Sequence, residues 1–318
     1  MIIAVLLLFL GLALLIKGAD WLVSGASSLA KKYNVSDLAI GLTIVAFGTS
    51  APELVVNVLA SLENHQDIVF GNVIGSNNFN LFMILGIAGL ITPLNVHSST
   101  VWKEIPLSFV AVILVFFLVN DNTVSSQPYV LSRIDGLILL MLFGMFLTYV
   151  YSQLKSEPED NQSAAETLPP FKQWTYIVIG FAGLVVGGEL VVNNAVEIAA
   201  AIGISEKIIG LTVVAAGTSL PELATSVVAA LKKNIDIAVG NVIGSNIFNL
   251  LFILSASAIS NPITYDPAFN RELIILGIGT GLLFTAMFTG KKKKLDRWEA
   301  GVLLIFFVAY ISYLVINA

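Results

Sequence analysis

The sequence predicts an all-α integral membrane protein with ten transmembrane helices, arranged as two inverted-topology five-helix repeats with broken helices at the membrane midplane. Three observations predict this fold class. The 318 residues are 57% hydrophobic and 12% charged, whereas soluble domains carry about 25% charged residues. Ten apolar runs are long enough to cross a bilayer core, which is roughly 30 Å thick. Two sequence phrases recur at a constant spacing of 169 residues, each inside an apolar run.

The apolar runs define the predicted spans, because a membrane-crossing helix needs about 20 apolar residues. They lie near residues 2–30, 36–61, 68–91, 102–120, 133–153, 174–201, 205–231, 236–260, 270–289 and 297–317. The first run has no basic segment before it and continues past any small-residue cleavage site, which is typical of a retained span. The chain has no cysteine, which excludes disulfides, thiolate metal sites and cysteine nucleophiles.

The charges between the spans predict the orientation. If the spans alternate, twelve of the sixteen Lys and Arg residues lie on one side, and only Arg133, Lys207 and Arg271 lie on the other. Cytoplasmic loops carry the Lys and Arg excess, so we expect a multi-pass protein of the plasma membrane with both termini outside. Residues 1–153 would then form the first five-helix repeat, 154–172 a cytoplasmic linker, and 173–318 the second repeat.

One charged pair lies inside the first span. Lys17 and Asp20 are three residues apart, and Glu189 is the counterpart of Asp20 at the spacing of 169 residues. Charges within a membrane are costly, so they are either paired or functional. A pair on one helix face and a functional site are both open on the sequence alone.

The first repeated phrase interrupts the second and seventh spans. It reads Gly-Leu-Thr-Ile-Val-Ala-Phe-Gly-Thr-Ser-Ala-Pro-Glu-Leu at 41–54 and returns at 210–223 with eleven of fourteen positions identical. Proline removes a helical N–H and clashes with the carbonyl four residues earlier. Both copies have glycine there, which tolerates distorted backbone. Each break therefore offers freed carbonyls, two hydroxyls and one carboxylate, Glu53 or Glu222, near the midplane.

The second repeated phrase follows each break. It reads Gly-Asn-Val-Ile-Gly-Ser-Asn-x-Phe-Asn at 71–80 and at 240–249, with nine of ten positions identical. Ser76 and Asn80 share one helix face, and so do Ser245 and Asn249, because residues four apart are neighbours on a helix. Helix packing, with small residues at the seam and polar ones bonding across it, is the alternative interpretation. Duplication beside a duplicated carboxylate favours a cation site instead.

The chemistry of these groups predicts which cations bind. Two ionised carboxylates buried together need a cation between them. Ca²⁺ takes about six to eight oxygen ligands in flexible geometry, and Na⁺ can use the same oxygens. Magnesium keeps its waters, and the spans contain no imidazole or thiolate to favour zinc, copper or nickel. His65 and His97 lie in connecting turns, where we expect them to be solvated.

The repeats also predict a mechanism. Five spans per repeat make equivalent helices run in opposite directions, and interrupted helices at matching positions then indicate a secondary transporter with its site at the midplane. The two phrases, each present twice, resemble the alpha repeats of the calcium/cation antiporter superfamily, most of all those of its sodium/calcium exchanger branch. This resemblance implies alternating access and exchange of Na⁺ for Ca²⁺ without ATP, with the bound, transported ions as the only cofactors.

The resemblance also implies a set of ligands. Glu53 and Glu222 would be the carboxylates shared by both ions, and Asn80 and Asn249 would lie at the centre. The remaining positions are the carbonyls of Thr49, Thr218, Ala46 and Ala215 and the hydroxyls of Ser50, Ser219, Ser76 and Ser245. Some relatives have aspartate where this chain has Asn249. With neutral side chains beside two carboxylates, one Ca²⁺ already balances the charge of the site, so we expect transport here to be independent of K⁺.

Three other functions are less consistent with the sequence. In a calcium/proton or other cation/proton antiporter the glutamates would carry protons, but such a carrier needs no hydroxyl cage. A passive channel can also have inverted repeats, although paired carboxylates at a closed midplane favour occluded binding. An enzyme is excluded because the polar residues of the spans make no nucleophile–base pair. The partners we expect are the lipid bilayer, Ca²⁺ and Na⁺; the sequence indicates no nucleic acid and no obligatory protein partner.

Overall fold

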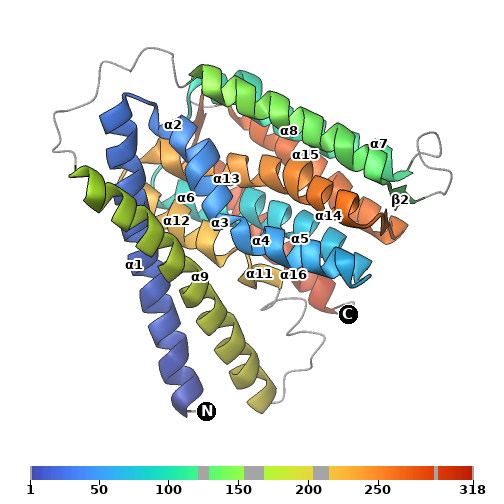
Figure 1. The fold of residues 1–318 in the computed structure, drawn as a ribbon, viewed down its shortest axis with the longest axis horizontal. Coiled ribbons are helices and arrows are strands. Elements are labelled where there is room, and N and C mark those ends of the chain that lie inside the picture. The colour runs from blue at the N-terminus through green and yellow to red at the C-terminus, as the bar shows by residue number, and fades with distance from the viewer. Residues whose placement is uncertain (1, 121–128, 154–167, 203–214, 290–292, 317–318) are drawn as a thin grey trace.

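The computed structural model describes residues 2–120, 129–153, 168–202, 215–289 and 293–316, which are almost entirely helical (Figure 1). The helices of the first half are α1 (Ile2–Tyr33), α2 (Asp37–Ile40), α3 (Ala46–Thr49), α4 (Ala51–Leu62), α5 (Gln66–Asn78), α6 (Leu85–Ile91), α7 (Ile105–Asn120) and α8 (Arg133–Gln153). Those of the second half are α9 (Pro170–Ala201), α11 (Ala215–Gly217), α12 (Leu220–Leu231), α13 (Ile235–Ile247), α14 (Leu254–Ser260), α15 (Asn270–Ala286) and α16 (Arg297–Ile316).

Eight stretches of the described residues are long and apolar enough to cross a membrane, and a ninth results if one bent helix pair counts as a single span. That pair joins Asp37–Thr49 to Ala51–Leu62 with a bend of 48°. The predicted span near 205–231 lies partly outside the described residues, which resume at α11 and continue into α12. The all-helical membrane class is confirmed, with eight or nine candidate spans where we expected ten.

Short π-helical segments, which the sequence analysis did not foresee, interrupt several spans. They are η1 (Gly41–Val45), η2 (Phe79–Ile84), η3 (Thr100–Glu104) and η5 (Phe248–Ile253), while η6 (Pro267–Phe269) is a 3₁₀ turn. Two of them, η2 and η5, occupy equivalent positions, and each begins at the last two residues of the second repeated phrase. Single π turns inside α-helices are frequent at functional sites, and here they carry the last asparagine of each phrase.

Two pairs of two-residue strands also lie outside the predicted all-helical pattern. β1 (Leu94–Asn95) pairs antiparallel with β4 (Lys294–Leu295), and β2 (Val130–Leu131) pairs antiparallel with β3 (Ile263–Thr264). Each pair joins a connection of the first half to one of the second half. The apolar residue at each strand position facing the bundle is buried, so these pairs fasten connecting loops onto the helix ends.

The helices α1 and α9 run antiparallel, side by side along one edge of the molecule (Figure 1). Glycines at the seam bring their backbones into contact: a Cβ added to Gly11 would lie 2.8 Å from the carbonyl oxygen of Gly187. A Cβ on Gly18 would lie equally close, 2.8 Å, to the carbonyl oxygen of Gly180. Small residues at membrane helix seams permit this close approach, so larger residues there would force the two helices apart.

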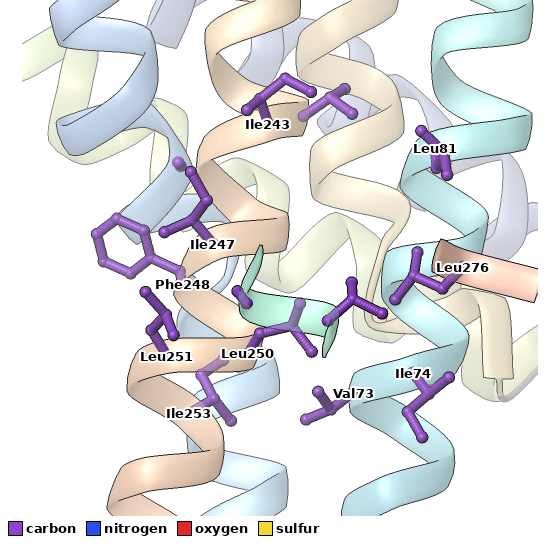
Figure 2. Close-up of a cluster of buried hydrophobic side chains, with 14 of the residues drawn as sticks. Val73, Ile74, Leu81, Ile243, Ile247, Phe248, Leu250, Leu251, Ile253 and Leu276 are labelled. Atoms are coloured by element: carbon purple, nitrogen blue, oxygen red, sulfur yellow. The ribbon is translucent and has the colours of Figure 1, made fainter. Parts of the chain in front are cut away.

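The two helices that carry the second repeated phrase form the centre of the bundle. Figure 2 shows Val73, Ile74 and Leu81 of α5–η2 and Ile243 and Leu250 of α13–η5 among the buried apolar side chains. The polar residues of the phrase are buried as well, apart from Asn72, which is partly buried. Apolar packing therefore fixes the position of these helices, and their polar side chains can be aimed at the neighbouring broken helices.

Several charged residues outside the centre form ion pairs. Lys17 Nζ lies 3.9 Å from Asp20 Oδ2, so the structure shows the pair on one helix face, one of the two interpretations that the sequence left open. Lys232 Nζ lies 2.5 Å from Asp20 Oδ1. His97 is partly exposed, and it has a partner that the sequence did not indicate: its Nε2 lies 3.0 Å from Oδ2 of Asp236. The two residues are 139 positions apart in sequence, so no local spacing could have indicated their contact.

Candidate cation-binding site

The two breaks have the same backbone geometry. Ser50 has φ −84° and ψ 6°, and Ser219 has φ −88° and ψ 5°. Each serine precedes a helix, α4 or α12, that has proline in its first turn, where the missing N–H costs nothing. Glu53 and Glu222 lie in that same first turn, and the positive end of a helix dipole stabilises a carboxylate there.

The glycines of the breaks serve packing and not the backbone distortion that we expected. A Cβ on Gly48 would overlap the ring of Phe181, and a Cβ on Gly217 would collide with Cγ2 of Val192. Neither glycine has the positive φ that would require the absence of a side chain. Both neighbours belong to α9, so glycine allows this one helix to lie directly against the two breaks.

Each break contacts the carboxylate of the other break. Glu53 and Glu222 are both 1% exposed. The Ser50 hydroxyl donates to Oε1 of Glu222 over 2.8 Å and lies 3.0 Å from the Ser245 hydroxyl. The Ser219 hydroxyl donates to Oε1 of Glu53 over 3.4 Å. The structure thus brings together the predicted serines and glutamates of two segments far apart in the sequence.

The predicted asparagines lie on the π segments η2 and η5, which contact the glutamate-bearing helices α12 and α4 respectively. Asn80 in η2 donates its amide hydrogen to Oδ1 of Asn246, and Asn249 in η5 donates to Oδ1 of Asn77, both over 3.0 Å. Both asparagines are 1% exposed. Their side-chain carbonyl oxygens accept no hydrogen bond from the described residues, and the buried hydroxyl of Ser76 has no partner there either.

Five predicted ligand atoms are therefore buried without a hydrogen-bond partner in the described parts of the chain: Glu53 Oε2, Glu222 Oε2, Ser76 Oγ, Asn80 Oδ1 and Asn249 Oδ1. A buried polar atom left without a partner costs about 1–3 kcal/mol, and more for a charged one. All five are hard oxygen donors, which suit Ca²⁺ and Na⁺. The described residues include no group of three or more His, Cys, Asp or Glu side chains that could hold a metal, so the charge of the site is that of two carboxylates.

The threonines use their hydroxyls to hold the breaks in place. Thr49 donates to Oδ1 of Asn241 over 3.0 Å, and Thr218 accepts from the amide of Asn72 over 3.0 Å. Each threonine is thus bonded to the helix of the opposite repeat. With the hydroxyls engaged, the backbone carbonyls of the threonines remain the groups that we expect to contact a cation.

The two predicted alanine carbonyls differ in how much the structure describes. The carbonyl of Ala46 accepts from the N–H of Ser50 over 3.0 Å and from the Thr49 hydroxyl over 3.3 Å. Ala215 is the first residue of α11, directly after residues outside the described part. A sodium ion could bind the Ala46 carbonyl once Thr49 bonds Asn241 alone.

Sequence reasoning missed the residues that hold the glutamate backbones. Asn57 donates to the carbonyl of Glu53 and to Oδ1 of Asn72, each over 2.6 Å. In the second half, Asn241 donates to the carbonyl of Glu222 over 3.3 Å and to the hydroxyl of Ser226 over 2.9 Å. Spacing could have found Asn57, because a polar residue four positions after a glutamate lies on the same helix face. Asn241 lies 19 positions after Glu222, on the next helix, so local spacing gives no such signal for it.

Comparison with known proteins finds a family and several relatives that match almost the whole chain. Residues 3–152 and 172–316 match the family described as sodium/calcium exchanger protein. The protein CaxA of Alkalimonas amylolytica is 38% identical over 327 residues, covering 100% of both chains. Sodium/calcium exchanger MaX1 of Methanosarcina acetivorans is 32% identical over 344 residues, covering 97% of both. A structure of the sodium-calcium exchanger NCX_Mj, soaked with 10 mM Na⁺ and 10 mM Sr²⁺, has a TM-score of 0.83 at 34% identity and 98% coverage of each chain.

Proposed function

We propose that this chain, which belongs to the sodium/calcium exchanger protein family, exchanges Na⁺ for Ca²⁺ across the membrane by alternating access. The family consists of membrane transporters and not of enzymes, and its members carry their ions as substrates without a further cofactor. The exchanged ions would occupy the site between the two breaks, and transport would not require K⁺.

The observation that carries this proposal is that two buried glutamates lie in one site together with buried side-chain oxygens that have no hydrogen-bond partner in the described residues. Glu53 and Glu222 supply two negative charges from opposite halves of the chain, and each keeps one oxygen free of protein donors in the described residues. One Ca²⁺ or two Na⁺ would balance that charge. Since both states are neutral, the same ligands can hold either load, which is what an exchanger requires.

Reciprocal contacts support two repeats of inverted topology. Shifting Gly11 and Gly18 by 169 residues gives Gly180 and Gly187, and the pairs in contact are Gly11 with Gly187 and Gly18 with Gly180. A twofold axis between the helices exchanges one pair for the other, and it requires equivalent helices to run antiparallel. In this proposal 1–153 and 173–318 are the two repeats, and the seventh predicted span, near 205–231, brings the number of spans to ten.

The clustering of loops supports the alternation of the spans. A cavity of about 1250 Å³ gathers residues from the ends of α1 and α12, from the turn after α6 and from the turn before α16. The predicted alternation of the spans puts all four of these segments on the cytoplasmic side. The lysines that line the cavity are Lys31, Lys232, Lys233 and Lys293. Two connections predicted to lie on the outer side also contact each other: in the turns after α14 and α4, Asn261 donates to Oδ1 of Asn64 over 3.0 Å.

The ion specificity can be tested in proteoliposomes that contain the purified protein. Uptake of radioactive calcium would be measured with Na⁺, K⁺ or a proton gradient loaded inside, and with no opposing gradient. We expect uptake only against internal Na⁺, compared with liposomes that lack protein. Uptake driven by the proton gradient would instead identify a calcium/proton antiporter, and uptake without any gradient would identify a channel.

The orientation can be tested with single cysteines, since the natural chain has none. Ser98 and Ala268 are both exposed and lie in equivalent connections of the two halves. We expect an impermeant thiol reagent to label Ala268→Cys in intact cells and to label Ser98→Cys only after the membrane is opened. The reverse pattern would place both termini inside.

A further inference from the structure

We propose that Asn77 and Asn246 are positioning residues, which fix the amide planes of Asn80 and Asn249 so that both side-chain carbonyl oxygens face the exchanged cation. The inference rests on the proposed function, because it concerns the ligands of that cation. Asn77 and Asn246 occupy the same position in the two copies of the second phrase. Neither was among the residues predicted to bind an ion.

The two positioning residues contact each other reciprocally across the centre of the bundle. The amide nitrogen of Asn77 donates to the backbone carbonyl of Asn246 over 3.4 Å, and the amide nitrogen of Asn246 donates to the backbone carbonyl of Asn77 over 3.4 Å. The two side chains are 0% and 2% exposed. They therefore form a closed pair that ties α5 to α13 at equivalent positions.

These backbone contacts determine how each side-chain amide is turned. A backbone carbonyl can only accept a hydrogen bond, so the NH₂ group of Asn77 must face the carbonyl of Asn246. The Oδ1 atom of Asn77 then faces Asn249, which lies 3.0 Å away and must present its own NH₂ group. The same reasoning, begun at the carbonyl of Asn77, leads through Asn246 to the NH₂ group of Asn80 at 3.0 Å.

The consequence is a fixed direction for the two remaining carbonyl oxygens. With their NH₂ groups held by the positioning residues, Asn80 and Asn249 turn Oδ1 away from that contact, and these are two of the buried oxygens that no described residue bonds. If either amide turned over, it would present N–H groups to the cation in place of oxygen, and the amide dipole would repel the ion. The positioning residues prevent that turn without touching the ion.

The chain supplies a control for this role at the next position. Asn78 is 2% exposed and its amide donates to the backbone carbonyl of Glu272 over 3.3 Å. This contact points to α15 and not across the centre. The equivalent residue of the second copy is Ile247. Asn78→Leu therefore removes a buried amide from the same helix without touching the network of four asparagines.

The test is the Ca²⁺ affinity of purified protein, measured by calorimetry, together with thermal unfolding in the absence of Ca²⁺ and Na⁺. We expect Asn77→Leu and Asn246→Leu each to weaken Ca²⁺ binding by roughly ten-fold, the effect of losing one well-oriented ligand. Asn78→Leu should leave the affinity within about two-fold of the natural protein, and the unfolding temperatures of the three variants should be similar.

A double variant separates positioning from a general structural effect. If Asn77 acts through Asn249, then Asn77→Leu should weaken binding no further once Asn249→Leu is present, because interacting residues are not additive. Additive losses, or an unchanged affinity in Asn77→Leu, would overturn the proposal. If the leucine variant does not fold, Asn77→Ala gives the same readout. Absence of Ca²⁺ binding in the natural protein would refute the proposed function instead.

Discussion

The two broken-helix phrases are nearly identical in sequence, yet their threonines bond in opposite senses. In the first copy, the hydroxyl of Thr49 donates its proton to Asn241. In the second, the hydroxyl of Thr218 accepts a proton from Asn72. Thr218 therefore keeps a proton that it can give to another acceptor, whereas Thr49 has used its proton. Two nearly identical motifs therefore form two halves of a site that differ in where their hydroxyl protons point.

The difference comes from a residue outside both motifs. Asn57 donates to Oδ1 of Asn72, so the NH₂ group of Asn72 turns to Thr218. At the equivalent position the second half has Ser226, whose oxygen accepts from the NH₂ group of Asn241. The Oδ1 atom of Asn241 consequently turns to Thr49. One substitution between the repeats reverses a chain of hydrogen bonds, which shows that repeat identity alone does not determine the chemistry of the site.

The largest effect that we expect follows from neutralising the carboxylate of either repeat. Glu53→Gln or Glu222→Gln leaves a buried site with one carboxylate for a divalent ion. Removing one member of a buried charge pair costs about 3–5 kcal/mol, so Ca²⁺ exchange should fall by about a hundred-fold or more. The measurement is calcium uptake against internal Na⁺, with unfolding temperature as the control for folding. Near-normal uptake by both variants would refute the two-carboxylate site.

The next effect compares the packing of the breaks against α9. Gly48→Ala would force the methyl group into the ring of Phe181, whereas Gly217→Ala would meet the methyl group of Val192. Overpacking costs about 1–3 kcal/mol, and the planar ring can move less, so we expect the larger loss of unfolding free energy at Gly48. A matched control is Gly75→Ala, because a Cβ there has nothing within 4 Å.

Thermal unfolding of these three variants would measure the difference. Equal unfolding temperatures for Gly48→Ala and the natural protein would show that α9 does not lie against the first break. A second variant, Phe181→Ala combined with Gly48→Ala, should recover part of the loss, since it removes the ring that the new methyl group meets.

A smaller effect is expected from exchanging the residue that makes the halves differ. Asn57→Ser should let Asn72 turn over, as Asn241 does beside Ser226, and Thr218 would then donate its proton to Asn72. The loss of one oriented hydrogen bond near the site should change the Ca²⁺ affinity by about two- to ten-fold. The apparent affinities for Ca²⁺ and Na⁺ would be measured in the same proteoliposomes. If neither changes, the asymmetry between the repeats has no role in ion binding.

The comparison also shows which features a sequence can predict. Pro52 and Pro221 are strong local signals for a break, and duplication drew attention to the glutamates beside them. The structure places the predicted serines against those glutamates. The ten spans and the ion roles of these residues remain predictions, because 203–214 lie outside the described residues and the roles came from a resemblance.

Other features had no signal in the sequence. The π segments η2 and η5 arise where apolar runs pack at the centre, and ordinary helix periodicity does not distinguish them from α-helix. The direction of each amide depends on partners about 170 residues away in sequence. The predicted role of Gly48 in tolerating distorted backbone is wrong, because the ring that it packs against, Phe181, belongs to the other half of the chain and gives no local signal.

The two repeats agree at one position of the site, where both have a neutral asparagine. Asn80 and Asn249 are both neutral, so the buried ligands carry only the charge of the two glutamates. Asp20 and Glu189, the two acids at equivalent positions of the first span of each repeat, are unavailable to add to it. Asp20 is bonded by Lys232 over 2.5 Å, and Glu189 is exposed. An aspartate in one repeat would raise the charge to −3 and make room for a further monovalent cation.

Transport should therefore be independent of K⁺. We expect no change in calcium flux when K⁺ is removed, which is the smallest effect predicted. One Ca²⁺ balances the two carboxylates, and a K⁺ ion carried with it would leave an excess positive charge in a medium of low dielectric, which costs several kcal/mol. The measurement is calcium flux driven by a fixed Na⁺ gradient, with K⁺ present or replaced by choline and the membrane potential clamped. Asn249→Asp is the matched variant, because it adds the missing charge at one repeat only. A flux that collapses in the natural protein when K⁺ is removed would show that a third acid reaches the site, and the agreement between Asn80 and Asn249 would then not decide which ions are carried.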